Sequence, residues 1–375
     1  MNKDIPCQNK QLCTGCMACV NVCQSSAIKI KENEDGFLEP YILENACTKC
    51  NLCRIKCPIN HLEPEWNIIN AYAAYVKDSS LRKSSSSGGI FSMISSLIIK
   101  YGGIVYGAAF DDNYNVKHVR CETIEELYYL RGAKYVQSDI SNIYEEIKMF
   151  LNEGKLVYFV GTPCQVAGLK SYLGKQYTNF ISSDLICHGV PSPAVWRKFL
   201  LEKNVEDIKN ISFRDKRFGW ENYSLVIKSD DKELVYDRYN NDYMKGFLDN
   251  FFLRNSCYEC KFKGYVRVSD ITLADFWGIN NIDANFDKNN EGTSLILINS
   301  RKGQRIFDLI QDDIVSKKVD YKEAISYNKS AIFSSYYPVQ RKRFLKKIQN
   351  NNFSKVLNDC QKLNFKERVI IKLKR

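Results

Sequence analysis

Between residue 66 and about residue 320, apolar runs of two lengths alternate along the chain. Short runs rich in aromatic and β-branched residues predict strands, among them NAYAAYV, GIVYGAAF, KLVYFVG and NFISSDLIC. Longer segments with helical spacing predict helices between them, namely SSSSGGIFSMISSLIIK, ISNIYEEIKMFLNEG and PAVWRKFLLEK. Strands that alternate with helices predict an α/β domain with a mixed sheet.

The pattern changes on either side of this alternation. Residues 209–240 predict a β insertion, and residues 301–315 predict a final helix. Near the N-terminus, KIKENEDGFLEPYI predicts a small hairpin. We therefore expect a small domain over residues 1–65, an α/β domain over residues 66–340 and a basic C-terminal tail over residues 341–375.

The predicted hairpin separates two segments with the same spacing, Cys-x2-Cys-x2-Cys-x3-Cys. Three such thiolates can hold one cubane, and the fourth reaches the other cluster. One 4Fe–4S cluster is then expected on Cys13, Cys16, Cys19 and Cys57, and a second on Cys47, Cys50, Cys53 and Cys23. The segment closely resembles the bacterial two-cluster ferredoxin module, which implies a ferredoxin-like α+β domain. A pair of structural zinc sites is the alternative.

Composition supports metal ligation by thiolates. Fifteen cysteines stand against three histidines, and the polar start of the chain has no apolar signal segment, so we expect a reducing cytoplasmic location. Of the net charge of +11, residues 341–375 carry +10, from twelve Lys or Arg and two acidic residues. Such a tail favours peripheral contact with anionic lipid, an acidic partner or non-specific nucleic acid, or forms a solvated helix.

Two stretches favour a phosphorylated cofactor. In SSSSGGIF, Ser86, Ser87, Gly88 and Gly89 offer hydroxyls and close backbone approach at the start of a helix. In RGAKYVQSD, two cations lie close to an aromatic and an amide side chain; these residues are Arg131, Lys134, Tyr135 and Gln137. Plain surface turns are the alternative for both stretches.

Four further cysteines follow. Cys164 begins a helix after one strand, Cys187 ends the next strand, and Cys257 and Cys260 form a Cys-x2-Cys loop. If the two strands are neighbours, these residues meet at one sheet edge and predict a third 4Fe–4S cluster. The alternatives are a nucleophilic Cys164, with a lowered pKa and His188 as its base, or inert buried thiols.

The blocks SSSSGGIFSMI, RGAKYVQS, GTPCQVAGLK, CHGVPSP and CYECKFKGYVRVSDITLADFWG resemble the coenzyme F-420 (deazaflavin) hydrogenase/dehydrogenase beta-subunit family. The resemblance implies FAD in the α/β domain beside one or more 4Fe–4S clusters. It also implies that the residues of the two cofactor stretches contact the flavin. The four further cysteines would then be cluster ligands.

The expected function is an iron–sulfur flavoprotein oxidoreductase that passes electrons between clusters, FAD and a deazaflavin or other organic acceptor. No G-x-G-x-x-G dinucleotide motif is present, so a direct NADH route is disfavoured. The alternatives are an electron-transfer subunit of a larger complex and a zinc-stabilised interaction protein. No catalytic residue is assigned; His188, the one histidine inside a motif, is the candidate proton donor. Further candidates near the site are Asp275, Phe276, Trp277, Lys261, Lys263 and Arg267.

Overall fold

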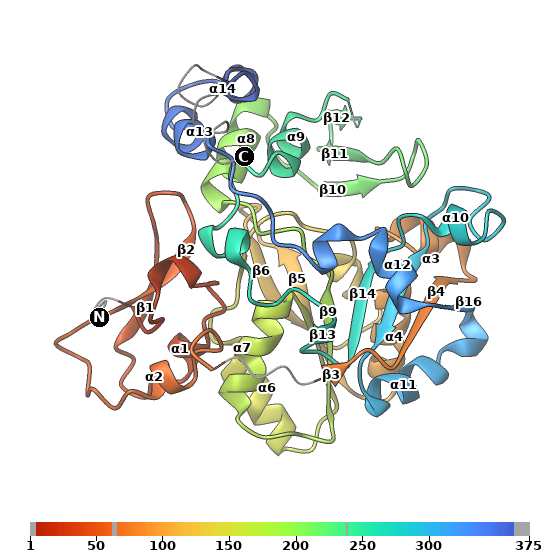
Figure 1. The fold of residues 1–375 in the computed structure, drawn as a ribbon, viewed down its shortest axis with the longest axis horizontal. Helices are drawn as coiled ribbons and strands as arrows, with labels where there is room; N and C mark the ends of the chain where they lie inside the picture. Colours follow the sequence, from red (N-terminus) through yellow and green to blue (C-terminus); the bar gives the residue numbers. More distant parts are fainter. Residues whose placement is uncertain (1–4, 62–65, 238, 364–375) are drawn as a thin grey trace.

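A large mixed sheet forms the centre of the computed structural model, which describes residues 5–61, 66–237 and 239–363 (Figure 1). In the described chain its strand order is β16-β4-β15-β14-β9-β8-β5-β6-β7. The bounds are β4 Asn70–Val76, β5 Ile104–Phe110, β6 Val116–Cys121, β7 Ser138–Asp139, β8 Val157–Gly161, β9 Phe180–Leu185, β14 Ile271–Asp275, β15 Ser294–Ile298 and β16 Ile314–Val319. Strands β5, β8, β9 and β14 run parallel, whereas β4, β15, β16 and β6 pair antiparallel. The predicted mixed sheet is confirmed.

Helices cover both faces of this sheet. On one face, α4 buries Ile90, Ile94 and Ile98 against a core that includes Val105 and Tyr158. On the other face, α6 and α7 pack in a second core. The helix bounds are α3 Ser79–Ser84, α4 Ile90–Lys100, α5 Leu127–Leu130, α6 Ile143–Asn152, α7 Pro163–Leu173, α10 Ile279–Ile282, α11 Arg301–Asp308 and α12 Tyr321–Ser326.

The prediction of a final helix over residues 301–315 is wrong at its C-terminal end. Helix α11 ends at Asp308, and β16 begins at Ile314 and pairs with β4 as an edge strand. The apolar residues Ile310 and Ile314 belong to the same core as α11, so burial alone could not separate helix from strand there.

The N-terminal module lies against one side of the large sheet domain (Figure 1). Its predicted hairpin is confirmed as the antiparallel pair β1 (Ile28–Glu32) and β2 (Leu38–Ile42). Two short helices, α1 (Ala18–Asn21) and α2 (Leu52–Ile55), carry parts of the two cysteine segments. A two-stranded pair, β3 (Trp66–Asn67) with β13 (Val266–Arg267), follows the module. The expected domain boundary at residue 65 lies outside the described residues.

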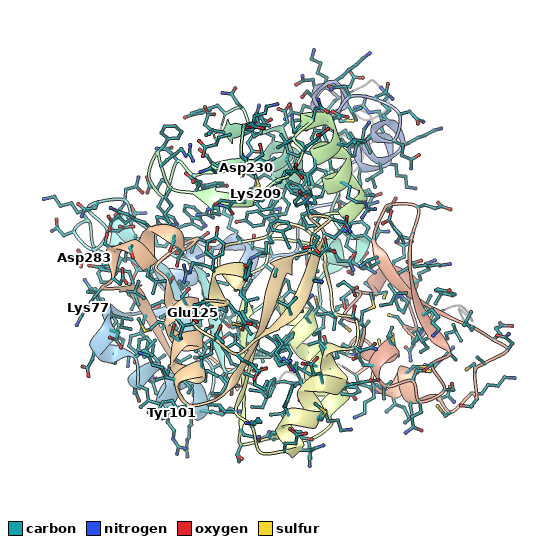
Figure 2. All side chains as sticks on the ribbon, turned by 180° about the vertical axis from the view of Figure 1, so that it is seen from behind. Lys77, Tyr101, Glu125, Lys209, Asp230 and Asp283 are labelled. Carbon is teal, nitrogen blue, oxygen red and sulfur yellow. The ribbon has the colours of Figure 1, made fainter. Side chains whose placement is uncertain are left out.

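A second lobe covers the sheet edge at the top of Figure 1. It holds the predicted β insertion as β10 (Asn210–Asp215), β11 (Ser224–Lys228) and β12 (Glu233–Tyr236). Helices α8 (Pro193–Lys203), α9 (Asp242–Leu248), α13 (Arg341–Ile348) and α14 (Phe353–Gln361) complete it. The view from behind shows Lys209 and Asp230, which form a 3.3 Å ion pair, on this lobe (Figure 2).

The described part of the expected basic tail folds into this lobe. Helices α13 and α14 bury Phe344, Leu345, Phe353 and Leu357 in the same aromatic core as Trp196. The residues after position 363 lie outside the described chain. Among the described helices, none combines the length and the apolar character that a bilayer span needs.

Candidate functional site

The first cysteine segment forms a small cavity at the side of the module that faces the sheet domain. Cys13, Cys16, Cys19 and Cys57 line it, together with Cys7. Gly15, at φ +70°, lets the segment coil around the cavity, since a left-handed backbone favours glycine. The four cysteines that the spacing assigns to one cluster therefore lie together.

The second cysteine segment lies closer to solvent. Cys50 is exposed, whereas Cys47, Cys53 and Cys23 are half-buried. Burial raises the pKa of Cys53, and the neighbouring thiols of Cys23, Cys47 and Cys50 raise it further. Cys23 of the first segment therefore contributes to the electrostatics of Cys53 in the second. The expected exchange of the fourth ligand stays a prediction.

The four further cysteines meet in one cavity. Cys164 is the second residue of α7, directly after β8, and Cys187 follows the parallel neighbour β9. Cys257 lies in a short 3₁₀ helix (Asn255–Glu259), and Cys260 follows it. All four line the same small cavity at the carboxyl edge of the sheet. Their ligation of a cluster stays a prediction.

The alternative of a nucleophilic Cys164 finds no geometric support. Burial raises the pKa of Cys164 well above its usual value. This effect outweighs the lowering of the pKa that is expected from the helix N-terminus. Its thiol lies 3.1 Å from the Thr162 hydroxyl. His188 instead bonds through Nε2 to the Asn250 amide oxygen at 2.7 Å, and its Nδ1 lies 3.4 Å from the Ser330 hydroxyl.

Two buried or half-buried cations lie at the wall of the four-cysteine cavity. Lys263 donates through Nζ to the carbonyl oxygens of Cys187 and Ser330. Arg267 is 2% exposed and pairs with Asp184 at 3.1 Å. Burial raises the pKa of Cys187, and both cations oppose this rise, so they favour the thiolate. Lys261 is exposed and takes no part in this cavity wall.

A much larger cavity, of about 300 Å³, lies directly beside the four-cysteine cavity. Its wall contains most residues of the two predicted cofactor stretches: Ser86, Ser87, Gly89, Arg131, Lys134, Tyr135 and Gln137. Gly88 is not in this wall. A Cβ on Gly88 would lie 2.3 Å from the Ala74 carbonyl oxygen, so glycine is needed there for packing against β4.

The N-terminus of α4 faces the large cavity. Gly89, at φ +85°, caps this helix, and the first three helical residues line the cavity wall. Helix N-termini attract anions because their N–H groups lack intrahelical partners. The Ser86 hydroxyl accepts a hydrogen bond from Ala133 N at 2.7 Å, which leaves its own proton for a ligand. The Ser87 hydroxyl donates to the Thr293 carbonyl oxygen at 2.7 Å.

Two lysines support the loops around this cavity. Lys134 donates to the carbonyl oxygens of Leu130, Arg131 and Gly132 at 3.0–3.2 Å. Burial lowers the pKa of Lys134 to about 7, so part of it loses its charge near neutrality. Lys216, which the sequence did not single out, donates to the Ser87 carbonyl oxygen at 2.7 Å, and burial lowers its pKa to about 7 as well. No local motif marks Lys216, because its role depends on contact between β10 and the serine loop.

Gln137 and Arg254 hold the module at the mouth of the cavity. The Gln137 amide accepts a hydrogen bond from Leu38 N at 2.9 Å and donates to Leu38 O at 3.0 Å. Arg254, 4% exposed, donates to Cys13 O at 2.8 Å and to Leu38 O at 3.0 Å. Gln137 therefore binds the hairpin of the module as well as lining the cavity. No local pattern marks Arg254, apart from its position three residues before Cys257.

The aromatic candidates of segment 270–278 lie away from the large cavity wall. Phe276 is fully buried in a separate core, and Trp277 stacks on Trp220 at 4.7 Å. Asp275 does line the cavity and pairs with buried Arg214 at 2.6 Å. The structure thus favours a core role for both aromatics and keeps Asp275 as a cavity residue.

The distances between the thiols differ between a zinc site and an iron–sulfur cluster. Among the described residues, no three His, Cys, Asp or Glu side chains lie close enough to hold a single metal ion. One tetrahedral zinc draws all its thiolates to about 2.3 Å from itself, whereas a cubane spreads its four thiolates over four irons. The assignment of these thiols to clusters stays a prediction.

Comparison with known sequences identifies both parts of the chain. Residues 12–61 match the family described as a 4Fe-4S dicluster domain, which defines an iron–sulfur protein. Residues 154–323 match the family described as the C terminus of the coenzyme F420 hydrogenase/dehydrogenase beta subunit. The resemblance that the sequence blocks indicate is thereby confirmed: residues 154–323 match this beta-subunit family and residues 12–61 match a two-cluster iron–sulfur domain. Among curated proteins, the comparison finds no match.

A solved structure supports the fold. The chain is similar to a chain of the F420-reducing [NiFe] hydrogenase complex from Methanosarcina barkeri, a structure described as a xenon derivative. The TM-score is 0.50 and the identity is 16%, over 76% of this chain and 91% of the other. At this identity the likeness shows a shared fold.

Proposed function

We propose that the chain is an iron–sulfur flavoprotein oxidoreductase. It passes electrons between three 4Fe–4S clusters, FAD and a deazaflavin or another organic acceptor. The residues that would hold the third cluster are Cys164, Cys187, Cys257 and Cys260, and FAD would occupy the large cavity beside them. When bound, FAD supplies the exchange between single electrons and electron pairs.

One observation carries this proposal: Thr14 lies in the wall of all three cavities. Thr14 directly follows Cys13 of the first cysteine segment. Cys164 lies in the walls of both the four-cysteine cavity and the large cavity. The three cavities therefore adjoin one another, which supports a proposed route from the first module cluster through the third cluster to the flavin.

The large cavity is suited to a dinucleotide on chemical grounds. It combines the N-terminus of α4, a free Ser86 proton and the cations Arg131 and Lys134, which together favour a pyrophosphate. Apolar residues such as Leu130, Ile186 and Leu273 also line it and suit a flat ring system.

Electrons would enter or leave at the second cysteine segment. Cys50 is exposed there, whereas Cys16 and Cys19 of the first segment are buried. This order of exposure favours a protein partner that docks at the second segment, in line with the proposal of a redox partner. The acceptor at the flavin side would bind in the same large cavity, next to Asp275.

The test compares the wild-type chain with the double variant Cys257→Ser/Cys260→Ser. Both are purified anaerobically and loaded with FAD, and the module clusters are reduced through a small ferredoxin and its reductase. We expect rapid flavin bleaching at 450 nm in the wild type, and a loss of at least about tenfold in rate in the double variant, with the module clusters still reduced. Equal flavin reduction rates would contradict the proposed route. Reoxidation by deazaflavin, NAD(P) or another acceptor then identifies the acceptor class.

A further inference from the structure

Cys7 belongs to neither cysteine segment, yet it lies inside the first cluster site. It is 3% exposed and forms a small core with Ile5 and Cys57, against which Cys13 and Ile59 pack. Its thiol donates to the Asn9 carbonyl oxygen at 3.1 Å. A buried thiol in an apolar core is usually inert, but this one shares its cavity with expected metal ligands.

The described part of the chain brings five thiols to a site that needs four. Cys7 lines the same cavity as Cys13, Cys16, Cys19 and Cys57. Cys7 and Cys57 pack in the same small core and line the same cavity, so the two side chains are neighbours there. A cubane cluster has one coordination position per iron, and three of these positions are expected to go to Cys13, Cys16 and Cys19.

The chain also holds the two competing thiols together. Gln8 N donates to the Asn60 side-chain oxygen at 3.2 Å, and Asn60 donates to Arg54 O at 2.9 Å. These bonds fix the residues before the first cysteine segment to the end of the second cysteine segment. Cys7 therefore stays next to Cys57 without any contact from a partner or ligand.

We propose that Cys7 is a reserve fourth ligand of the first cluster, which takes the iron position of Cys57 when the Cys57 thiolate dissociates. The inference rests on the proposed assignment of this cluster. In the exchange, the Cys57 sulfur–iron bond breaks and a Cys7 sulfur–iron bond forms. The Cys7 proton moves to Cys57, so no electron is transferred and the net charge is unchanged. All four ligands then come from residues 7–19, and the first cluster no longer depends on the second segment.

The first test measures iron in full-length chains purified anaerobically. We expect Cys57→Ala and Cys7→Ala each to keep the iron content of the wild type. The double variant Cys7→Ala/Cys57→Ala should lose about four irons. So should the control Cys16→Ala, because Cys16 packs in a different core from Cys7. The electron paramagnetic resonance signal of the reduced first cluster should change shape in Cys57→Ala, because one ligand has changed, and vanish in the double variant.

Two different failures can be told apart. If the wild type is fully loaded and Cys16→Ala loses about four irons, a Cys57→Ala chain that loses the same four irons as the double variant overturns only the role of Cys7 as a reserve ligand. A wild type without iron contradicts the proposed function and this inference with it.

The second test avoids loss of Cys57 and so any folding defect. The loaded wild type and Cys7→Ala are treated anaerobically with iodoacetamide under native conditions, and labelled cysteines are mapped by mass spectrometry. Exchange exposes the Cys57 thiol while the cluster is retained, so Cys57 should be labelled at least about tenfold faster in the wild type than in Cys7→Ala. Equal labelling rates at Cys57 would overturn the proposal.

Discussion

Lys263 and Arg267 set the charge of the four-cysteine site at the scale of single residues. A cluster held by four thiolates is anionic, and reduction makes it more negative, so a nearby cation stabilises the reduced form and raises the reduction potential. Lys263 Nζ bonds to the carbonyl oxygen of Cys187 itself, which makes it a cation within direct reach of the site.

We predict that Lys263→Gln lowers the potential of the third cluster by on the order of 100 mV, because a unit charge several ångströms away in a partly buried site is worth a few kcal/mol. Redox titration followed by electron paramagnetic resonance measures the shift. Lys261→Gln is the matched control, since Lys261 is exposed on the same loop and should leave the potential unchanged. Equal potentials in Lys263→Gln and the wild type would show that the cation does not act on this site.

Lys134 predicts a pH dependence of FAD binding. Its pKa in the free protein lies near 7 because of burial, while a bound pyrophosphate favours the charged amine. Binding above pH 7 therefore requires proton uptake, and the apparent Kd for FAD should rise by up to about tenfold per pH unit between pH 7 and 9. His118, also in the cavity wall, has a pKa near 4 through burial and stays neutral over this range.

Titration of the FAD-free protein by flavin fluorescence measures this profile. The variant Lys134→Arg keeps its charge and should flatten the profile, whereas Lys134→Met should bind FAD weakly at every pH. A wild-type Kd that does not change between pH 6 and 9 would exclude this role of Lys134.

At the scale of elements, the loop before α4 connects packing to cofactor binding. Gly88 fits against the Ala74 carbonyl oxygen of β4 and donates from N to the Ser294 hydroxyl at 3.0 Å. An added methyl group has no room there and must push the serine loop outward. We predict that Gly88→Ala costs about 1–3 kcal/mol in the free energy of unfolding and lowers the FAD affinity at least about tenfold.

Gly154→Ala is the control for this prediction. Gly154 has φ +82° at the end of α6, with no neighbouring atom within 4 Å of an added Cβ. Its substitution should cost about 1 kcal/mol through backbone strain and leave FAD binding intact. Denaturant unfolding and flavin titration separate the two effects. Unchanged FAD binding in Gly88→Ala would contradict the coupling of this loop to the cavity.

The elements also show how far sequence reasoning reaches. Strands β4, β5, β8 and β9 follow from short apolar runs, and the parallel pairing of β8 with β9 brings Cys164 and Cys187 to one edge as expected. Other features depend on contacts between distant segments, which the local spacing of apolar residues does not reveal. These are the antiparallel strands β15 and β16 and the burial of α13 and α14. The same holds for Lys216 and Arg254, whose importance comes from tertiary contacts.

At the scale of the whole molecule, the module is built into the sheet domain. Arg254 and Gln137 bind its backbone, and a Cβ on Gly168 of α7 would lie 2.8 Å from the Cys16 Cβ. This close approach leaves no layer of solvent or side chain between α7 and the first cysteine segment. We predict that Gly168→Leu displaces the module and slows flavin reduction through it at least about tenfold, with iron content retained. Stopped-flow absorbance measures the rate, and Gly154→Ala should match the wild type.

The central claim is that thiolate-held iron clusters and FAD share this one chain. Elemental analysis and flavin quantification of the anaerobically purified full-length protein test it most directly. The account predicts about twelve irons, an equal amount of acid-labile sulfide and about one FAD per chain. A colourless protein with stoichiometric zinc and no flavin would contradict it.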